Sequence, residues 1–176
     1  MIDLPECHAF IACSLDGYIA RLDGSIDWLT NLPTPFDEDF GYAAFIARRD
    51  AILMGRGTFD KVAGFDPWPY SLPVTVLSRT LKLSQSPARQ TQVSHVGLRE
   101  TLQAMHAAGR RQVYVDGGQV ISGCLGQGLL TQLTLTRVPV VLGTGLPLFQ
   151  GVSERVMQVQ TVKHWPNGFV QTCFVM

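Results

Sequence analysis

The chain has 176 residues, of which 46% are hydrophobic and 16% charged, and its 14 basic side chains balance 14 acidic ones. This length suits one ordinary domain, residues 1–176, with a sizeable core, and the high apolar content excludes intrinsic disorder. A net charge of zero excludes the basic surface of a nucleic-acid-binding protein and argues against a polybasic membrane-surface protein, while it is compatible with self-association. We therefore expect a compact cytoplasmic domain that works on small molecules.

Neither a membrane segment nor a metal site is expected. No apolar stretch approaches the roughly 18 residues that a spanning helix requires, and the first residues lack the pattern of a secretory signal. The four cysteines are scattered without any CxxC pair, which favours reduced core thiols over disulfides or a metal site. The four histidines are equally dispersed, without a spacing that would place two ligands on one helix face.

The first expected strand, 8–15, is followed after a long loop by the pattern of a helix start. Thr34 is placed to cap the helix, Pro35 suits the first helical position, and the carboxylates at 37–39 suit the first turn. Apolar residues follow at three- and four-residue spacing up to Arg48 and Arg49, whose charges suit a helix C-terminus. We expect one helix over this whole segment.

Short β-branched runs then alternate with helical segments. The further strands expected are 50–55, 74–78, 93–96 and 112–115. The further helices expected are 58–63, 98–108, which stops at Gly109, and a small one that ends near Leu125. Such alternation implies mainly parallel strand pairing.

The last third of the chain has a different pattern. Residues 132–142 alternate leucine and threonine, and the runs 156–163 and 169–175 are separated by a Trp-Pro-Asn-Gly turn, which indicates an antiparallel hairpin. The sequence therefore predicts an α/β fold with a single mixed, mostly parallel sheet, flanked by helices and ending in a C-terminal antiparallel hairpin.

Three short elements that follow expected strands carry residues that suit phosphate groups. The first is Gly55-Arg56-Gly57-Thr58. Its glycines let main-chain N–H groups approach an anion, Thr58 can cap the next helix, and Arg56 can add a charge-assisted contact. The alternative is an ordinary tight turn with a surface arginine.

The second element is Ser78-Arg79, whose hydroxyl and guanidinium suit a phosphate monoester such as the 2′-phosphate that distinguishes NADP from NAD; a solvated strand end is the alternative. The third, 115–119, contains paired glycines between a strand and a short helix, where pyrophosphate can sit against helix N–H groups. Its alternative is a turn that needs a positive φ. Neither a Rossmann glycine motif nor a P-loop motif occurs.

The loop 14–28 has glycines at two possible bends and aromatic residues on either side. It is long enough to act as a lid that excludes water from a hydride transfer. The competing interpretation is a rigid Ω-type loop packed by Ile19, Ile26 and Trp28. We expect Asp16 to brace this loop rather than to transfer protons.

Five motifs carry a resemblance that extends over nearly the whole chain. They are Ser14-Leu15-Asp16-Gly17-Tyr18-Ile19-Ala20, Asp23-Gly24-Ser25-Ile26-Asp27-Trp28-Leu29, Met54-Gly55-Arg56-Gly57-Thr58-Phe59, Val76-Leu77-Ser78-Arg79 and Val115-Asp116-Gly117-Gly118. In their order and separations they resemble the dihydrofolate-reductase-like superfamily. More closely, they resemble stand-alone relatives of the reductase domain of the riboflavin-pathway bifunctional deaminase–reductase.

The resemblance implies an NADPH-dependent reductase fold, with cofactor-binding residues at the matching positions. Ala12 and Ile19 would line the nicotinamide side. The residues that would contact the phosphates and the adenosine 2′-phosphate are Gly55, Arg56, Gly57, Thr58, Ser78 and Arg79. Those that would meet the pyrophosphate are Gly117, Gly118, Gln119 and Val120.

The substrate side departs from true dihydrofolate reductases, which carry a carboxylate four residues before an aromatic on the first helix. Here the aromatic is Phe45 and the matching position is Gly41, so folate is not expected as the substrate. Asp37 and Asp39 lie nearby, but their charges suit a helix start. The candidate catalytic residues are Asp27 and Trp28, at the far end of the 14–28 loop.

The leading functional hypothesis is hydride transfer from NADPH to a small heterocyclic or ribosylaminopyrimidine-type substrate, as in 5-amino-6-(5-phosphoribosylamino)uracil reductase. A non-catalytic NADP(H)-binding sensor is the alternative, and a structural interaction domain is a third. A homodimer is also expected. The 67–70 loop or the apolar segment 138–142 could form its interface, although the core is the simpler location for the latter.

Overall fold

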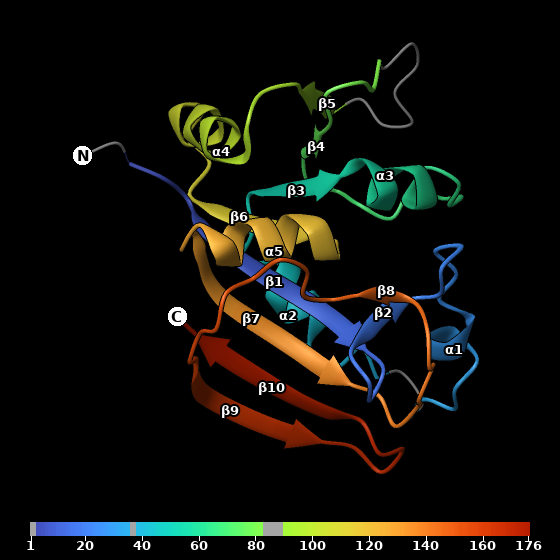
Figure 1. Ribbon diagram of the computed structural model, residues 1–176. Helices are drawn as coiled ribbons and strands as arrows, with labels where there is room; N and C mark the ends of the chain where they lie inside the picture. The colour runs from blue at the N-terminus through green and yellow to red at the C-terminus, as the bar shows by residue number, and fades with distance from the viewer. Residues whose placement is uncertain (1–2, 36–37, 83–89) are drawn as a thin grey trace.

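The computed structural model describes residues 3–35, 38–82 and 90–176 and contains one large mixed sheet (Figure 1). Its eight strands are β1 (Glu6–Cys13), β3 (Ala51–Gly55), β4 (Val74–Leu77), β5 (Thr91–Ser94), β6 (Gln112–Asp116), β7 (Leu130–Arg137), β9 (Gln158–His164) and β10 (Val170–Val175). They lie in the order β5-β4-β3-β6-β1-β7-β10-β9. A second, two-stranded sheet joins β2 (Tyr18–Ala20) to β8 (Leu146–Pro147).

The pairing directions confirm the α/β prediction. Every pair from β5 to β7 is parallel, whereas β10 pairs antiparallel with both β7 and β9. The two antiparallel strands β9 and β10 form the expected C-terminal hairpin. The parallel strands need crossovers, and the helices supply several of them.

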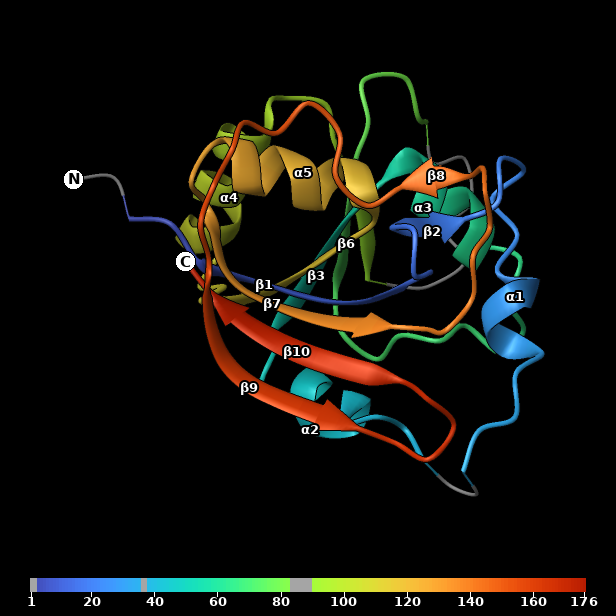
Figure 2. The same ribbon diagram turned by 60° about the horizontal axis from the view of Figure 1, so that its bottom comes forward.

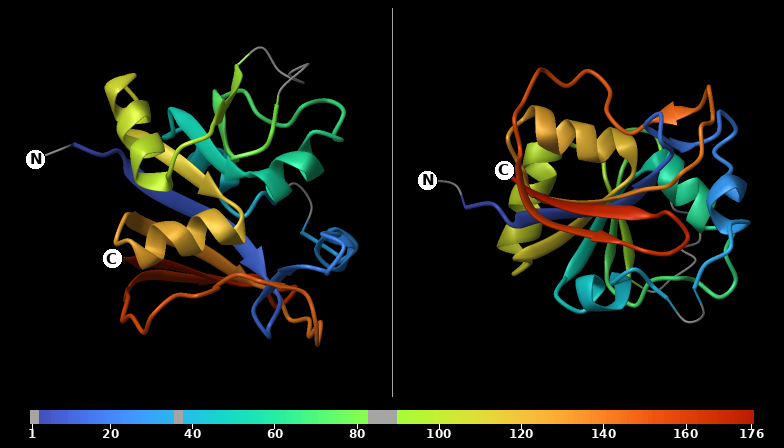
Figure 3. Two further views of the ribbon diagram at one scale, coloured as in Figure 1. Left: turned by 45° about the horizontal axis from the view of Figure 1, so that its top comes forward. Right: turned by 90° about the horizontal axis from the view of Figure 1, so that it is seen from below.

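Helices cover both faces of the sheet. They are α1 (Asp27–Thr30), α2 (Tyr42–Ile46), α3 (Arg56–Val62), α4 (Leu98–Ala107) and α5 (Gly118–Gly126). Figures 2 and 3 show α4 and α5 on one face and α2 on the other. Because side chains alternate along a strand, Leu53 and Val115 pack in the core with α4 and α5, whereas Ile52 and Tyr114 pack with α2 and α3.

The helix predicted from Pro35 to Arg49 is much shorter in the structure. Helix α2 begins only at Tyr42, because Phe40 and Gly41 have positive φ angles of 55° and 87°, which a right-handed helix does not allow. The Asp39 carboxylate accepts hydrogen bonds of 2.8 Å from the main-chain N–H groups of Gly41 and Ala43. Asp39 therefore does act at a helix start, later in the chain than predicted, while Asp37 lies outside the described residues.

Several further boundaries differ from the predictions, and strands β1 and β5 both begin two residues earlier than expected. The strand expected over 132–142 ends at Arg137, after which Val138 is fully buried in the core. Helix α3 begins at Arg56 with Gly55 as its N-cap, so Thr58 lies inside the helix and does not cap it. Among the described residues, no helix is long and apolar enough to cross a bilayer, and no three His, Cys, Asp or Glu side chains gather as metal ligands.

A buried polar group lies at the N-terminal end of β1. The His8 ring is 7% exposed, and neither of its nitrogens has a hydrogen-bond partner among the described residues. Glu6 Oε2 lies 3.4 Å from His8 Nε2, but burial and the positive charge of Arg49 together lower the pKa of His8 below its usual value. The folded protein therefore favours the neutral imidazole.

This arrangement predicts an acid-sensitive contribution to stability. A histidine with a lowered folded pKa is protonated first in the unfolded state, so stability falls as the pH drops below the unfolded value of about 6.5. We expect the free energy of unfolding of His8→Gln to decrease less than that of wild type between about pH 7.5 and about pH 5 in urea titrations. His164→Gln, which removes an exposed histidine of β9, should keep the wild-type pH dependence. Equal slopes for wild type and His8→Gln would contradict the assignment.

Candidate functional site

A pocket of about 200 Å³ lies where β3 and β6 end and α5 begins. Its lining comes from segments that are far apart in the sequence: β2 and β8 on one side, the turn into α3 and the start of α5 on the other. Figure 2 shows the start of α5 beside β2, β8 and α3. The lining residues are Ile19, Gly55, Gly57, Thr58, Gly117, Gly118, Gln119, Val120, Leu146, Pro147 and Gln150. Eight of these residues were expected at a cofactor site.

The paired glycines after β6 are required by the geometry of this pocket. Gly117 has a φ of 89°, and a Cβ there would collide with the Thr58 hydroxyl. A Cβ on Gly118 would lie 3.0 Å from Ile19 Cδ1, 3.1 Å from the Pro147 carbonyl oxygen and 3.3 Å from that of Leu148. The first glycine is needed for its backbone conformation, and the second for the close approach of another chain segment.

The start of α5 presents unpaired main-chain donors to the pocket. The first main-chain hydrogen bond of the helix runs from Ile121 N–H to the Gly117 carbonyl, at 3.0 Å. No side chain caps the helix, and the N–H groups of Gly118, Gln119 and Val120 have no acceptor among the described residues. All three residues line the pocket. Three free N–H groups and the positive end of the helix dipole together favour an anion such as a diphosphate.

The element after β3 contributes its backbone but not its arginine. Gly55, Gly57 and Thr58 line the pocket, and a Cβ on Gly57 would meet only open space. Arg56 does not line it, because its Nε donates to both carboxylate oxygens of Asp60 at 2.7 Å. The two residues are four positions apart, about one helical turn, and both side chains are about half exposed. Such ion pairs are common on helix surfaces.

Ser78 and Arg79 lie at the end of β4 and do not line this pocket. The Ser78 hydroxyl oxygen accepts the Leu81 N–H at 3.1 Å, which leaves its own proton available to a ligand. Arg79 is exposed, and the Ser78 carbonyl lies 2.8 Å from Nδ1 of His95, which follows the neighbouring strand β5. His95 was not predicted as a site residue, because the expected strand 93–96 included it, whereas the strand of the structure ends at Ser94.

The loop 14–28 is held by hydrogen bonds rather than left free. The Asp16 carboxylate accepts the Ser14 hydroxyl at 2.6 Å and the N–H groups of Leu142 and Gly143 at 3.1 and 2.7 Å. These bonds, the one from Ser14 first, lower the pKa of Asp16. Asp16 thus connects two loops as a charged brace. The arrangement favours the rigid interpretation of the loop over the mobile lid.

The two candidate catalytic residues have different surroundings. The exposed Asp27 carboxylate accepts a 2.7 Å hydrogen bond from Arg21 Nε, and this bond lowers the pKa of Asp27. Trp28 is only 6% exposed and packs with Val138 and Phe169. Its indole N–H is buried and has no acceptor in the described part of the chain. Ala12, which was expected on the nicotinamide side, packs against this same cluster and does not line the pocket.

Asp116 is a functional candidate that the sequence analysis treated only as part of a turn. It is the last residue of β6, directly before Gly117, and its carboxylate accepts the Tyr70 hydroxyl at 3.1 Å. Burial raises the pKa of Asp116 above its usual value, although the hydrogen bond from Tyr70 opposes that rise. Asp116 does not itself line the pocket, but it directly precedes Gly117, which does. A carboxyl group that retains its proton to higher pH in such a position is a general-acid candidate.

The family model of the RibD C-terminal domain matches residues 5–170 of this chain. The chain belongs to the RibD C-terminal domain family. Protein YwjB of Bacillus subtilis is 30% identical over 141 residues, which cover 80% of each chain. The riboflavin biosynthesis protein RibD of Corynebacterium ammoniagenes is 28% identical over 156 residues, which cover 81% of this chain but only 45% of that protein.

Solved structures of RibD-like proteins share the fold. A putative riboflavin biosynthesis protein from Shewanella sp. PV-4 superposes with a TM-score of 0.90 at 36% identity, covering 97% of this chain and 98% of that one. The deaminase/5-amino-6-(5-phosphoribosylamino)uracil reductase of Thermotoga maritima has a TM-score of 0.72 at 17% identity, covering 98% of this chain and 56% of that one. The chain thus shares its fold with these RibD-like proteins.

Proposed function

We propose that this RibD C-terminal domain is an NADPH-dependent reductase that acts on a small heterocyclic or ribosylaminopyrimidine-type substrate. The observation that carries the proposal is the start of α5. Three residues there have N–H groups without acceptors among the described residues, and all three line the pocket. Gly117 and Gly118 have no side chains, which allows the close packing around this helix start. Membership of a family that includes riboflavin-pathway reductases supports it.

The residues present fit a dinucleotide phosphate. The pocket of about 200 Å³ is below the roughly 300–1,000 Å³ of a complete small-molecule site, so it suits the diphosphate portion and not the whole cofactor. Ser78 and Arg79 would hold the 2′-phosphate end, with His95 beside them. NADPH bound there supplies a hydride to the acceptor.

Asp116 would supply the matching proton. It lies on the same strand face as Tyr114, two residues away, and therefore faces away from α5. Burial raises its pKa, so the carboxyl group holds its proton to a higher pH than an exposed aspartate does, and this proton would pass to the nitrogen or oxygen next to the carbon that accepts the hydride. Tyr70 would hold the carboxyl group in place.

The cofactor assignment predicts a selective effect of Arg79→Ala. We expect NADPH, followed by fluorescence titration, to bind more tightly than NADH. Loss of the guanidinium should weaken NADPH binding by about tenfold or more and leave NADH binding nearly unchanged, because only NADPH carries the 2′-phosphate. Arg99→Ala, an exposed arginine on α4, serves as the matched control and should change neither affinity. Equal losses for both cofactors would remove the 2′-phosphate assignment, and no binding at millimolar cofactor would remove the proposal.

A non-catalytic NADP(H) sensor is favoured by one observation. Helix α2, with the sequence Tyr-Ala-Ala-Phe-Ile, carries no carboxylate that could face a substrate. A sensor would bind NADPH without oxidising it in the presence of pteridines and ribosylaminopyrimidines. Oxidation of NADPH with any of these acceptors would decide in favour of the reductase.

We also propose that the chain forms a homodimer. The segments considered from the sequence are largely used within the fold, since Val138 is buried and Trp68 and Tyr70 pack against the core. The hairpin instead exposes Val159, Val162 and Val170, at 58%, 59% and 41%. Light scattering coupled to size-exclusion chromatography measures the mass, and a monomer at micromolar concentration would contradict the proposal.

A further inference from the structure

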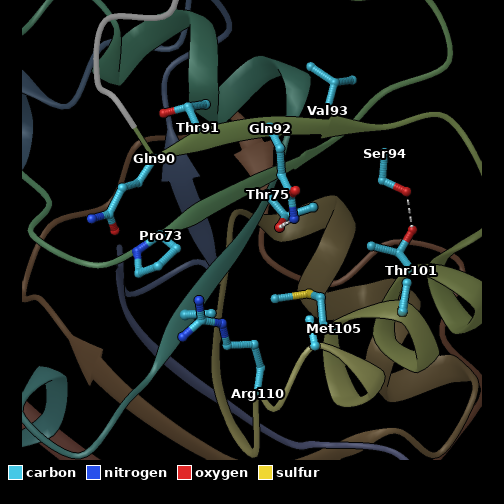
Figure 4. A pocket seen from close by; sticks show the side chains of 13 residues that line it. Pro73, Thr75, Gln90, Thr91, Gln92, Val93, Ser94, Thr101, Met105 and Arg110 are labelled. Atoms are coloured by element: carbon cyan, nitrogen blue, oxygen red, sulfur yellow. Dashed lines mark hydrogen bonds between the residues drawn. The ribbon is translucent and has the colours of Figure 1, made fainter.

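A second, larger cavity lies at the opposite end of the parallel strands. It has a volume of about 670 Å³ and opens between α4 and the strands β4 and β5 (Figure 4). Ala51, the first residue of β3, lines it, whereas Gly55, the last residue of that strand, lines the cofactor pocket. The volume is within the roughly 300–1,000 Å³ that small-molecule sites occupy. The cleft is therefore separate from the site described above and large enough for a ligand of its own.

The hydroxyl groups in the cleft differ in whether their protons are available to a ligand. The Thr101 hydroxyl donates to the Gly97 carbonyl at 2.8 Å, so the Ser94 hydroxyl must be the donor in its 2.6 Å bond to Thr101. Neither proton is left for a ligand. Thr75, by contrast, accepts the Gln92 amide at 3.0 Å, and its own proton has no acceptor within the described ranges. Because Thr75 is only 4% exposed, this donor is held inside the protein.

The cleft also has a net positive charge. Among the described residues that line it, Arg110 is the only charged one, and none carries a carboxylate. Arg110 is half-buried, donates one 3.3 Å bond to the Asp50 carbonyl, and takes part in no ion pair with the described residues. Figure 4 shows Arg110 and Met105 on one side of the cleft and Thr75 with Gln92 on the other. Ala51, Ala104 and Ala108 add apolar surface.

We propose that this cleft binds a small monocarboxylate with a compact apolar body. The guanidinium of Arg110 and the free proton of Thr75 would receive the carboxylate oxygens, and Met105 with the alanines would contact the body. A single cation among the described lining residues suits one negative charge better than the two of a phosphate monoester. The site goes beyond the reductase activity and does not depend on it.

Benzoate is the probe for this proposal, with benzamide and phenyl phosphate as comparison ligands, in titrations of the ¹⁵N-labelled chain followed by NMR. We expect saturable shifts for residues of β4, β5 and α4, and binding of benzamide and phenyl phosphate weaker by about tenfold or more. Arg110→Gln should weaken benzoate binding by about tenfold or more, while replacement of an exposed arginine on α4, Arg99→Gln, should not.

A second variant tests whether the ligand occupies the cleft, without changing the charge of Arg110. Ala104→Phe would fill the cleft from an exposed position of α4 and should abolish benzoate binding while leaving Arg110 in place. Saturating NADPH should leave benzoate affinity unchanged. The proposal is overturned by non-saturable shifts, by unchanged affinity in Arg110→Gln, by stronger binding of phenyl phosphate, or by competition with NADPH. The last result would place the probe in the cofactor pocket.

Discussion

Replacing Gly118 with alanine should weaken NADPH binding by roughly 10- to 100-fold, because the added methyl group costs about 1–3 kcal/mol at the start of α5. Its Cβ would lie 3.0 Å from the Ile19 side chain and within 3.3 Å of two main-chain carbonyl oxygens of the 146–148 segment. Main-chain atoms cannot rotate aside as a side chain can. Relief of the contact must therefore shift the helix start and its free N–H groups, which we propose bind the diphosphate.

Gly126→Ala is the matched control on the same helix. A Cβ at Gly126, the last residue of α5, meets nothing within 4 Å. Alanine there should raise the free energy of unfolding by about 0.5–1 kcal/mol and leave NADPH affinity unchanged. Fluorescence titration gives the affinities and urea unfolding gives the stabilities. If Gly118→Ala bound NADPH as tightly as Gly126→Ala, the diphosphate assignment would be wrong.

Asp116→Asn should lower kcat for NADPH oxidation by about 10²- to 10⁴-fold without changing NADPH affinity, since a general acid is lost while the phosphate contacts remain. The wild-type rate should fall as the pH rises through the raised pKa of Asp116, because the carboxyl group then loses the proton that it donates. That part of the pH profile should be absent in the variant.

Two further variants separate a catalytic role from a structural one. Tyr70→Phe removes a hydrogen bond that favours the ionised carboxylate, so the pKa of Asp116 should rise and the fall in rate should move to higher pH. Glu100→Gln removes an exposed carboxylate of α4 and should leave the profile in place. Carbon-13 NMR of the Asp116 carboxyl group tests the pKa without turnover. A value at or below the usual 3.9 or so would contradict the assignment.

Much of the phosphate-binding part of the site could be predicted from local sequence. A glycine pair between an apolar run and a helix indicates exposed N–H groups wherever the strand lies in the sheet. The pairing of Arg56 with Asp60 was also accessible, because the two are four residues apart on one helix.

Other parts of the site depend on contacts that no local pattern reports. Leu146, Pro147 and Gln150 reach the pocket because β8 pairs with β2, more than 120 residues earlier in the chain. Asp116 acquires its raised pKa from burial, and the hydrogen bond that opposes this rise comes from Tyr70, which lies 46 residues away. The start of α2 was set by the backbone conformations of Phe40 and Gly41 against the preferences of the preceding residues.

The neutral, apolar composition, the alternation of strands and helices and the glycine-bearing turns determined the fold class and the candidate phosphate contacts, because each rests on interactions within a few residues. The tertiary structure decided which turns meet, since Gly55 and Gly117 are brought together only by the parallel pairing of β3 with β6. It also decided which carboxyl group has a raised pKa, since Asp116 is partly buried while Asp16 and Asp27 are exposed and accept hydrogen bonds that lower theirs. Both decisions depend on long-range packing, which sets distance and burial in a way that residue type alone does not.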